Sequence, residues 1–76
     1  MADEVIRLIF PPNLLNNPIV NTLIRTYHNL TVNILRADFT QDTGWLEIQI
    51  VGQAAAIESA ISWLREKGIE IQTLGA

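Results

Sequence analysis

The sequence predicts an α+β fold in which four strands and two helices follow in the order β-α-β-β-α-β. Three observations support this prediction. Two segments space their apolar residues three and four positions apart, four others are alternating or rich in β-branched residues, and proline, asparagine and glycine separate them. A chain of 76 residues has room for one core. We therefore expect a single domain over residues 1–76.

The chain begins with a strand and a helix. Glu4–Phe10 is mostly apolar or β-branched, and Pro11–Pro12 ends this run because proline cannot donate to a strand ladder. Asn17 before Pro18 predicts a helix start, with Asn17 as the N-cap and Pro18 at the first helical position. The apolar face of this helix holds Val20, Leu23, Ile24 and Tyr27.

A hairpin of two strands is expected next. Asn29 is a candidate left-handed helix terminator, and Leu30–Phe39 is rich in strand-favouring residues. The alternation of this strand slips, so either apolar residues lie on both faces or a bulge re-phases it. Asp42 and Gly44 then predict a turn, through Asx chemistry and positive φ, before Trp45–Val51 alternates.

The last part of the chain predicts a helix and a short strand. Gln53–Lys67 forms the helix, Gly68 caps it, and Ile69–Leu74 is the strand. With right-handed crossovers, this order gives a ferredoxin-like sandwich, in which two helices cover one face of a four-stranded antiparallel sheet. The apolar stripe of the second helix holds Ile57, Ala60, Ile61 and Leu64.

Composition excludes several classes of function. Five Lys+Arg against eight Asp+Glu give a formal charge of -3, and there is no basic run, so we expect no nucleic-acid partner. Without cysteine there is no disulfide, thiolate metal site or cysteine nucleophile. The acidic opening Met1–Glu4 and the lack of an apolar run of ~20 residues predict a cytoplasmic protein without direct membrane insertion.

Catalytic chemistry is not indicated either. His28 is the only histidine and lies off the apolar stripe, as a surface residue does. Asp38 and Asp42 flank the hairpin turn, and turn chemistry explains Asp42 better than acid–base catalysis. No nucleophile with a nearby base, phosphate loop or dinucleotide fingerprint occurs. We expect no enzyme, cofactor or metal site.

The sheet face away from the helices is the candidate functional surface. It is too apolar to be merely solvated, so we interpret it as a homodimer or ligand surface; alternatively, its residues fill the core. Bases could stack on Trp45 and Phe39, but Glu47 lies beside Trp45 and the RNA-recognition sequence pattern is missing. The residues expected on this face are Trp45, Glu47, Gln49 and Val51 from the third strand and Asn33, Leu35, Ala37 and Phe39 from the second.

The residues also resemble a known family. Val32-Asn33-Ile34-Leu35, then Gly44 in a turn, Gly52, and a helix ending Trp63-Leu64 before Gly68-Ile69, resemble the NIL domain, which is named for its Asn-Ile-Leu tripeptide. The resemblance covers nearly the whole chain and implies an ACT-like variant of the ferredoxin-like fold. NIL domains are best known as C-terminal regulatory modules of the ATPase subunit of bacterial methionine importers. There they bind methionine, pair across a dimer and restrain transport.

The resemblance implies a site and partners. Other members are free-standing, as this chain is expected to be, or are joined to ferredoxin modules, so a transporter or a ferredoxin-type protein is a possible partner. Asn33 could supply a donor and an acceptor to an amino acid, and Arg36 is the nearest cation for its carboxylate. Alternatively, Asn33 only bonds a neighbouring strand and Arg36 is solvated. Ile34, Leu35 and Ala37 could line the thioether slot.

Two functions therefore stay open on the sequence. The first is an amino-acid sensor, for methionine as an example, that works as a homodimer. The alternative is a protein–protein interaction module without a small ligand. The residues expected on the dimer or partner face are Phe39, Trp45, Glu47 and Gln49.

Overall fold

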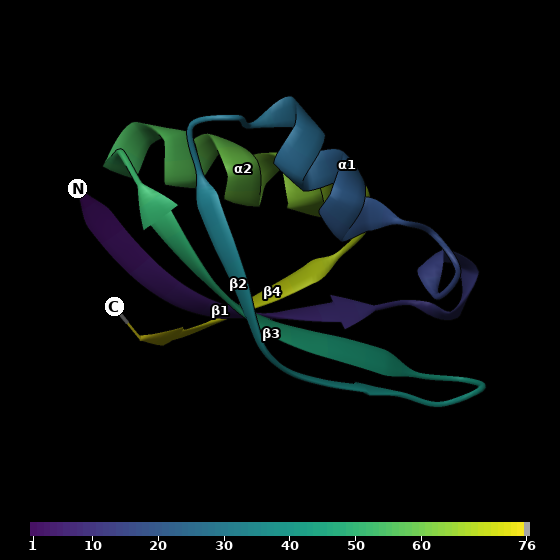
Figure 1. Ribbon diagram of the computed structural model, residues 1–76. Coiled ribbons are helices and arrows are strands. Elements are labelled where there is room, and N and C mark those ends of the chain that lie inside the picture. The colour runs from purple at the N-terminus through teal and green to yellow at the C-terminus, as the bar shows by residue number, and fades with distance from the viewer. Residues whose placement is uncertain (76) are drawn as a thin grey trace.

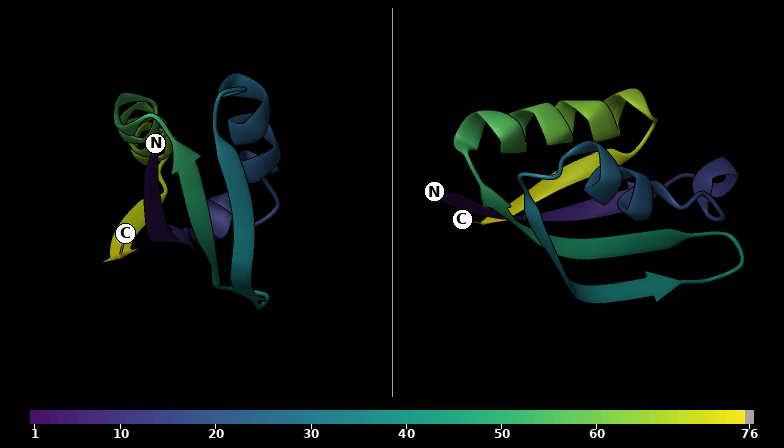
Figure 2. Two further views of the ribbon diagram at one scale, coloured as in Figure 1. Left: turned by 60° about the vertical axis from the view of Figure 1, so that its left-hand side comes forward. Right: turned by 45° about the horizontal axis from the view of Figure 1, so that its top comes forward.

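The computed structural model describes residues 1–75 and confirms the ferredoxin-like α+β fold (Figure 1). The strands form one antiparallel sheet in the order β2-β3-β1-β4, so β2 and β4 are its edges. Both helices cover the same face, as Figure 2 shows, and the opposite face is called the open face below. The elements are β1 (Ala2–Phe10), a 3₁₀ turn η1 (Pro12–Leu14), α1 (Ile19–Thr26), β2 (Thr31–Phe39), β3 (Gly44–Gly52), α2 (Ala54–Glu66) and β4 (Glu70–Gly75).

The core lies between the helices and the two central strands. Ile6 and Leu8 of β1 have 0% of their surface exposed and lie opposite Ile48 and Leu46 of β3. Neither helix of residues 1–75 combines the length and hydropathy that crossing a bilayer requires. The whole predicted stripe of α2 is buried against this sheet: Ile57, Ala60, Ile61 and Leu64.

The start of α1 differs from the prediction. Pro18 rather than Asn17 is the N-cap, and no side chain caps the helix. The Asn17 carbonyl instead accepts a bond from the Ile19 N–H at 2.8 Å. Ile24 is 46% exposed, because Ile19 and Leu23, one turn apart, are the residues that α1 buries. The predicted stripe is therefore wrong at Ile24.

The end of α1 is also corrected. The helix stops at Thr26, and the N–H of the C-cap Tyr27 donates to the Leu23 carbonyl at 3.0 Å. Among residues 1–75 no residue other than glycine has positive φ, so Asn29 is not a left-handed terminator. Gly68 does end α2 in this way, with a φ of 97°, as predicted.

The predicted hairpin of β2 and β3 is confirmed, but its turn uses a different side chain. The hydroxyl of Thr40 accepts bonds from the N–H groups of Asp42, at 3.3 Å, and Thr43, at 3.0 Å. The Thr40 N–H donates to the Thr43 carbonyl at 2.8 Å. Thr40 therefore supplies the turn chemistry that was expected of Asp42.

A β-bulge interrupts β2 inside the tripeptide. Ile34 lies opposite Ile48, but the next pair is Arg36 with Glu47, so Leu35 has no partner on β3. Two residues of β2 thus span the space of one on β3, which is the definition of a bulge. Of the two explanations for the slipped alternation, the re-phasing bulge is the correct one.

The bulge places Ala37 and Phe39 on the helix side of the sheet, not on the open face as predicted. Phe39 packs edge to face against the core residue Phe10, with ring centroids 5.4 Å apart. Gly44 lies opposite Phe39, and a Cβ at Gly44 would overlap the Phe39 ring and the Leu15 side chain. Gly44 has no positive φ, so the turn needs this glycine for space.

Truncating Leu8 tests the core. We expect Leu8→Ala to lower the free energy of unfolding by about 2–5 kcal/mol, because it leaves a cavity in the centre of the sheet. That loss is a large part of the about 5–15 kcal/mol typical of a domain. Urea unfolding followed by circular dichroism measures it. Leu74→Ala is the control, since Leu74 is 46% exposed on the edge strand; equal losses in both variants would contradict this account.

Candidate functional site

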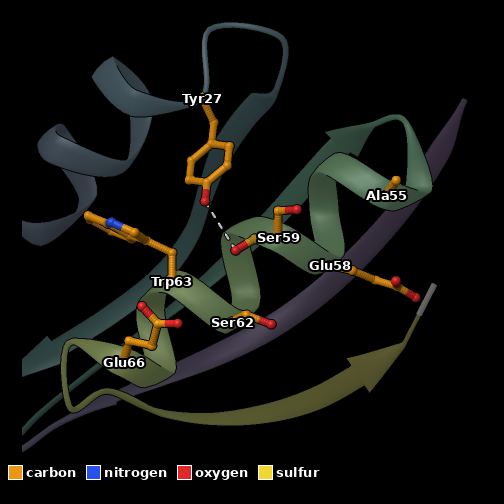
Figure 3. A pocket seen from close by; sticks show the side chains of 7 residues that line it. All are labelled: Tyr27, Ala55, Glu58, Ser59, Ser62, Trp63 and Glu66. Carbon is orange, nitrogen blue, oxygen red and sulfur yellow. Dashed lines mark hydrogen bonds between the residues drawn. The ribbon is translucent and has the colours of Figure 1, made fainter.

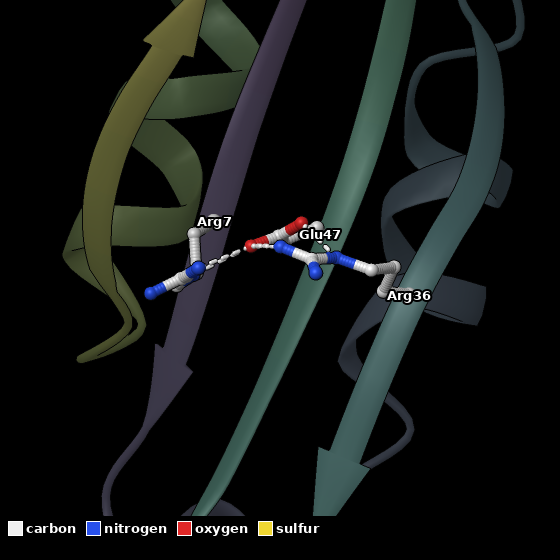
Figure 4. Close-up of polar contacts among 3 residues, drawn as sticks. All are labelled: Arg7, Arg36 and Glu47. Atoms are coloured by element: carbon white, nitrogen blue, oxygen red, sulfur yellow. Dashed lines mark hydrogen bonds and ion pairs between the residues drawn. The ribbon is translucent and has the colours of Figure 1, made fainter.

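The centre of the open face carries a charged cluster of three residues. Arg7 on β1, Glu47 on β3 and Arg36 on β2 lie opposite one another across three neighbouring strands (Figure 4). Arg7 Nε donates to Glu47 Oε2 at 2.8 Å, and Arg7 Nη2 donates to the same oxygen. Arg36 Nε donates to Glu47 Oε1 at 2.8 Å, and its Nη2 donates to Oε2 at 3.0 Å. One carboxylate thus holds a guanidinium on each side.

Glu47 is ionised and almost enclosed in this cluster. It is only 4% exposed, and the hydrogen bonds from Arg36 and then from Arg7 lower the pKa of its carboxyl, against the opposing effect of burial. The same bond raises the pKa of Arg36. Both guanidiniums also lie over the Trp45 ring, 4.8 Å and 5.7 Å from its centroid. Two cations and one anion leave one positive charge within this cluster.

Asn33 of the tripeptide belongs to a second polar row. Its Nδ2 donates to Gln49 Oε1 at 3.2 Å, and Gln49 Nε2 donates to Asp3 Oδ2 at 3.0 Å. The bond to a neighbouring strand, one of the two roles considered for Asn33, is therefore present. Among residues 1–75 no group donates to Asn33 Oδ1, so this oxygen is available as an acceptor.

The bulge is what brings Asn33 and Arg36 to the same face. Residues three apart on a regular strand point to opposite faces. Because Leu35 is extra, Asn33 and Arg36 lie opposite Gln49 and Glu47, which are two apart on β3. They are therefore about 7 Å apart along the strand. An acceptor for an ammonium group and a donor for a carboxylate stand next to each other at the edge of the sheet.

The predicted ligand residues do not all lie on the same face of the sheet. Ile34 and Ala37 lie on the helix side, opposite Ile48 and Leu46, whereas Asn33 lies on the open face. Of the predicted partner-face residues, Trp45, Glu47 and Gln49 lie on the open face, and Phe39 does not. Arg7 was missed, although a charged residue within an apolar alternating strand is a signal that could have found it.

The edge strand β2 is almost uncovered. Eight of its nine residues are exposed, and only Val32 is half-buried. Three of the exposed residues are large and apolar, with exposures of 61% for Ile34, 50% for Leu35 and 46% for Phe39. An edge strand offers unpaired backbone groups to another strand, and apolar side chains favour such pairing.

The fold, the bulged tripeptide and the polar rows define a small ferredoxin-like domain with an open sheet edge. Residues 4–73 match the NIL domain family, and this chain belongs to that family.

Relatives of known name include the methionine import ATP-binding protein MetN of Helicobacter pylori, 27% identical over 96% of this chain. The protein of the same name from Helicobacter acinonychis shows the same identity and coverage. This chain spans only 23% of the length of each of these relatives.

Solved structures support the fold. The C-terminal domain of an ABC transporter ATP-binding protein from Enterococcus faecalis is 28% identical, with a TM-score of 0.78 over 95% of this chain and 83% of that one. The de novo designed protein Foldit4 has a TM-score of 0.60 over 97% of this chain and 96% of its own, at 13% identity, so that likeness concerns the fold alone.

The Glu47 cluster predicts a pH-dependent stability. The lowered pKa of Glu47 means that its ionised carboxyl stabilises the fold. This stabilisation is complete above the ordinary glutamate pKa of about 4.3. It is lost as the pH falls through the lower pKa of the folded state. We expect Glu47→Gln to lower the urea midpoint at pH 7, and the difference from wild type to shrink under strongly acidic conditions.

Glu70→Gln is the matched control, because Glu70 is an exposed glutamate on the edge strand β4. A Glu47→Gln difference that does not change with pH, or a Glu70→Gln effect of the same size, would contradict the role given to the cluster.

Proposed function

We propose that this NIL domain is a non-enzymatic, cytoplasmic regulatory domain that binds a small amino acid, with methionine the first candidate, at an interface between two copies. The observation that carries the proposal is the placement of Asn33 and Arg36 side by side on an uncovered edge strand. The names of the relatives, which are methionine import proteins, favour methionine over other amino acids.

The two polar groups match the two charges of an amino acid. The Arg36 side chain is 66% exposed, so its guanidinium can donate to a carboxylate while Glu47 holds its other edge. Asn33 Oδ1 accepts from the ammonium group. The two residues are roughly 7 Å apart along the strand, which is comparable to the length of a zwitterion with a hydrogen bond of about 2.9 Å at each end.

The apolar part of the site is incomplete within one chain. Leu35, the bulge residue that precedes Arg36 in the chain, is 50% exposed, whereas Ile34 and Ala37 lie on the helix side of the sheet. A second copy paired on the β2 edge would cover the side chain of the ligand and exclude water from it. The same pairing would bury the exposed apolar residues of β2. Ligand binding and pairing would then support each other.

A protein–protein interaction module without a small ligand is the second candidate. The uncovered β2 edge favours it equally, because another protein can add a strand there. A transporter component is the partner class suggested by the names of the relatives. A ferredoxin-type protein remains the other class under this proposal.

Methionine titration separates the two candidates. A sensor gains thermal stability on binding, by RT ln(1 + [L]/Kd), and its Asn33–Arg36 backbone amides shift in NMR spectra. Asn33→Ala should weaken binding roughly 10- to 100-fold, because a hydrogen bond to a charged group is lost. Asn21→Ala, at an exposed asparagine of α1, should bind normally. Methioninamide, which lacks the carboxylate, should bind poorly. No response to millimolar methionine would favour the interaction module.

Sedimentation tests the pairing of two copies. We expect a dimer at micromolar concentration and a monomer for Leu35→Asp, which places a charge on the β2 edge. Leu74→Asp is the control, since Leu74 is similarly exposed on the opposite edge strand β4. Circular dichroism verifies that both variants fold. A wild-type monomer with and without methionine, or equal dissociation of both variants, would refute the β2 dimer.

A further inference from the structure

A groove of about 500 Å³ runs along the outer face of α2, on the helix side of the sheet (Figure 3). Tyr27, at the end of α1, and Trp63 form its aromatic wall, with centroids 6.3 Å apart and planes at 76°. The Tyr27 hydroxyl donates to the Ser59 carbonyl at 3.1 Å, which fixes this wall against α2. Both rings are half-buried and keep surface open to the groove.

The groove is acidic as well as aromatic. Glu58 and Glu66 line it, and Glu58 also lines an adjacent pocket together with Arg65. Lys67, just beyond α2, holds its Nζ 5.4 Å from the centroid of Trp63. The ring therefore accepts a cation, and a partner's basic side chain that packs on Trp63 would replace Lys67 there. Carboxylates beside an aromatic face match the chemistry of lysine and arginine side chains.

The spacing of Glu58 and Glu66 along the axis of α2 fits an extended peptide. Glu58 and Glu66 are eight residues apart on α2, which is about 12 Å along the helix axis. Residues four apart in an extended segment are about 13 Å apart and point to the same side. Ser59 and Ser62 lie between the two glutamates, and such small side chains let a peptide backbone approach the helix.

We propose that this groove docks an extended segment of a partner protein that carries two basic residues four positions apart. These residues pair with Glu58 and Glu66, and one aliphatic stem packs on Trp63. The groove lies on the face opposite Asn33 and Arg36, so the two sites do not overlap and both can be occupied in one molecule.

The test uses the peptide Ac-Gly-Lys-Ala-Ser-Ala-Lys-Gly-NH2 and isotope-labelled protein in NMR titrations. We expect shifts at the amides of Ser59 and Ser62 and at the indole N–H of Trp63. The double variant Glu58→Gln/Glu66→Gln should weaken binding by roughly threefold or more, the effect of two exposed ion pairs. A peptide with glutamine for both lysines should not shift these signals, and one with adjacent lysines should bind more weakly.

Asp42→Asn/Glu70→Gln is the matched double variant, because it removes the same charge away from the groove. Unchanged binding by this control supports the proposal. Equal weakening in both double variants would show attraction by net charge alone and overturn it. Shifts confined to the open face, or none at millimolar peptide, would also overturn it.

Discussion

The extra residue Leu35 is the constraint on which the site and part of the core both depend. With regular alternation, Arg36 would point toward the helices, away from Glu47, and Asn33 would lack a cationic neighbour from its own strand on the open face. Phe39 would leave Phe10 and turn to solvent. One residue inserted into the edge strand therefore both packs Phe39 against Phe10 and places Arg36 opposite Glu47.

The ion cluster changes the character of the open face. Trp45 suggested an apolar surface, but two guanidiniums cover its ring and share the carboxylate of Glu47. Glu47 is nearly enclosed, so losing either arginine would leave a carboxylate with fewer compensating charges. The arrangement links three strands through a single side chain. A face built this way recognises charged groups more readily than hydrocarbon.

The fold could be predicted from the sequence because the patterns that indicate its helices and strands are local. The stripe from Ile57 to Leu64, the glycine after α2 and the alternation of β3 each depend on neighbouring residues only. The faces of Ala37 and Phe39 could not be predicted, because a bulge is decided by pairing with another strand. The meeting of Arg7 with Glu47 likewise requires the strand order. Asn33 was identified from its tripeptide, but the sequence did not show that it lies on the same face of the sheet as Arg36.

The uncovered β2 edge has a consequence for how the domain behaves in different assemblies. Pairing of freely diffusing chains through β2 costs translational and rotational freedom, so the paired fraction depends on their concentration. Two copies held close together in a larger complex experience an effective concentration in the millimolar range. The same edge would then be paired almost permanently. The assembly that holds the domain, rather than any change in the domain itself, would then determine what fraction of the β2 edges is paired when a ligand binds.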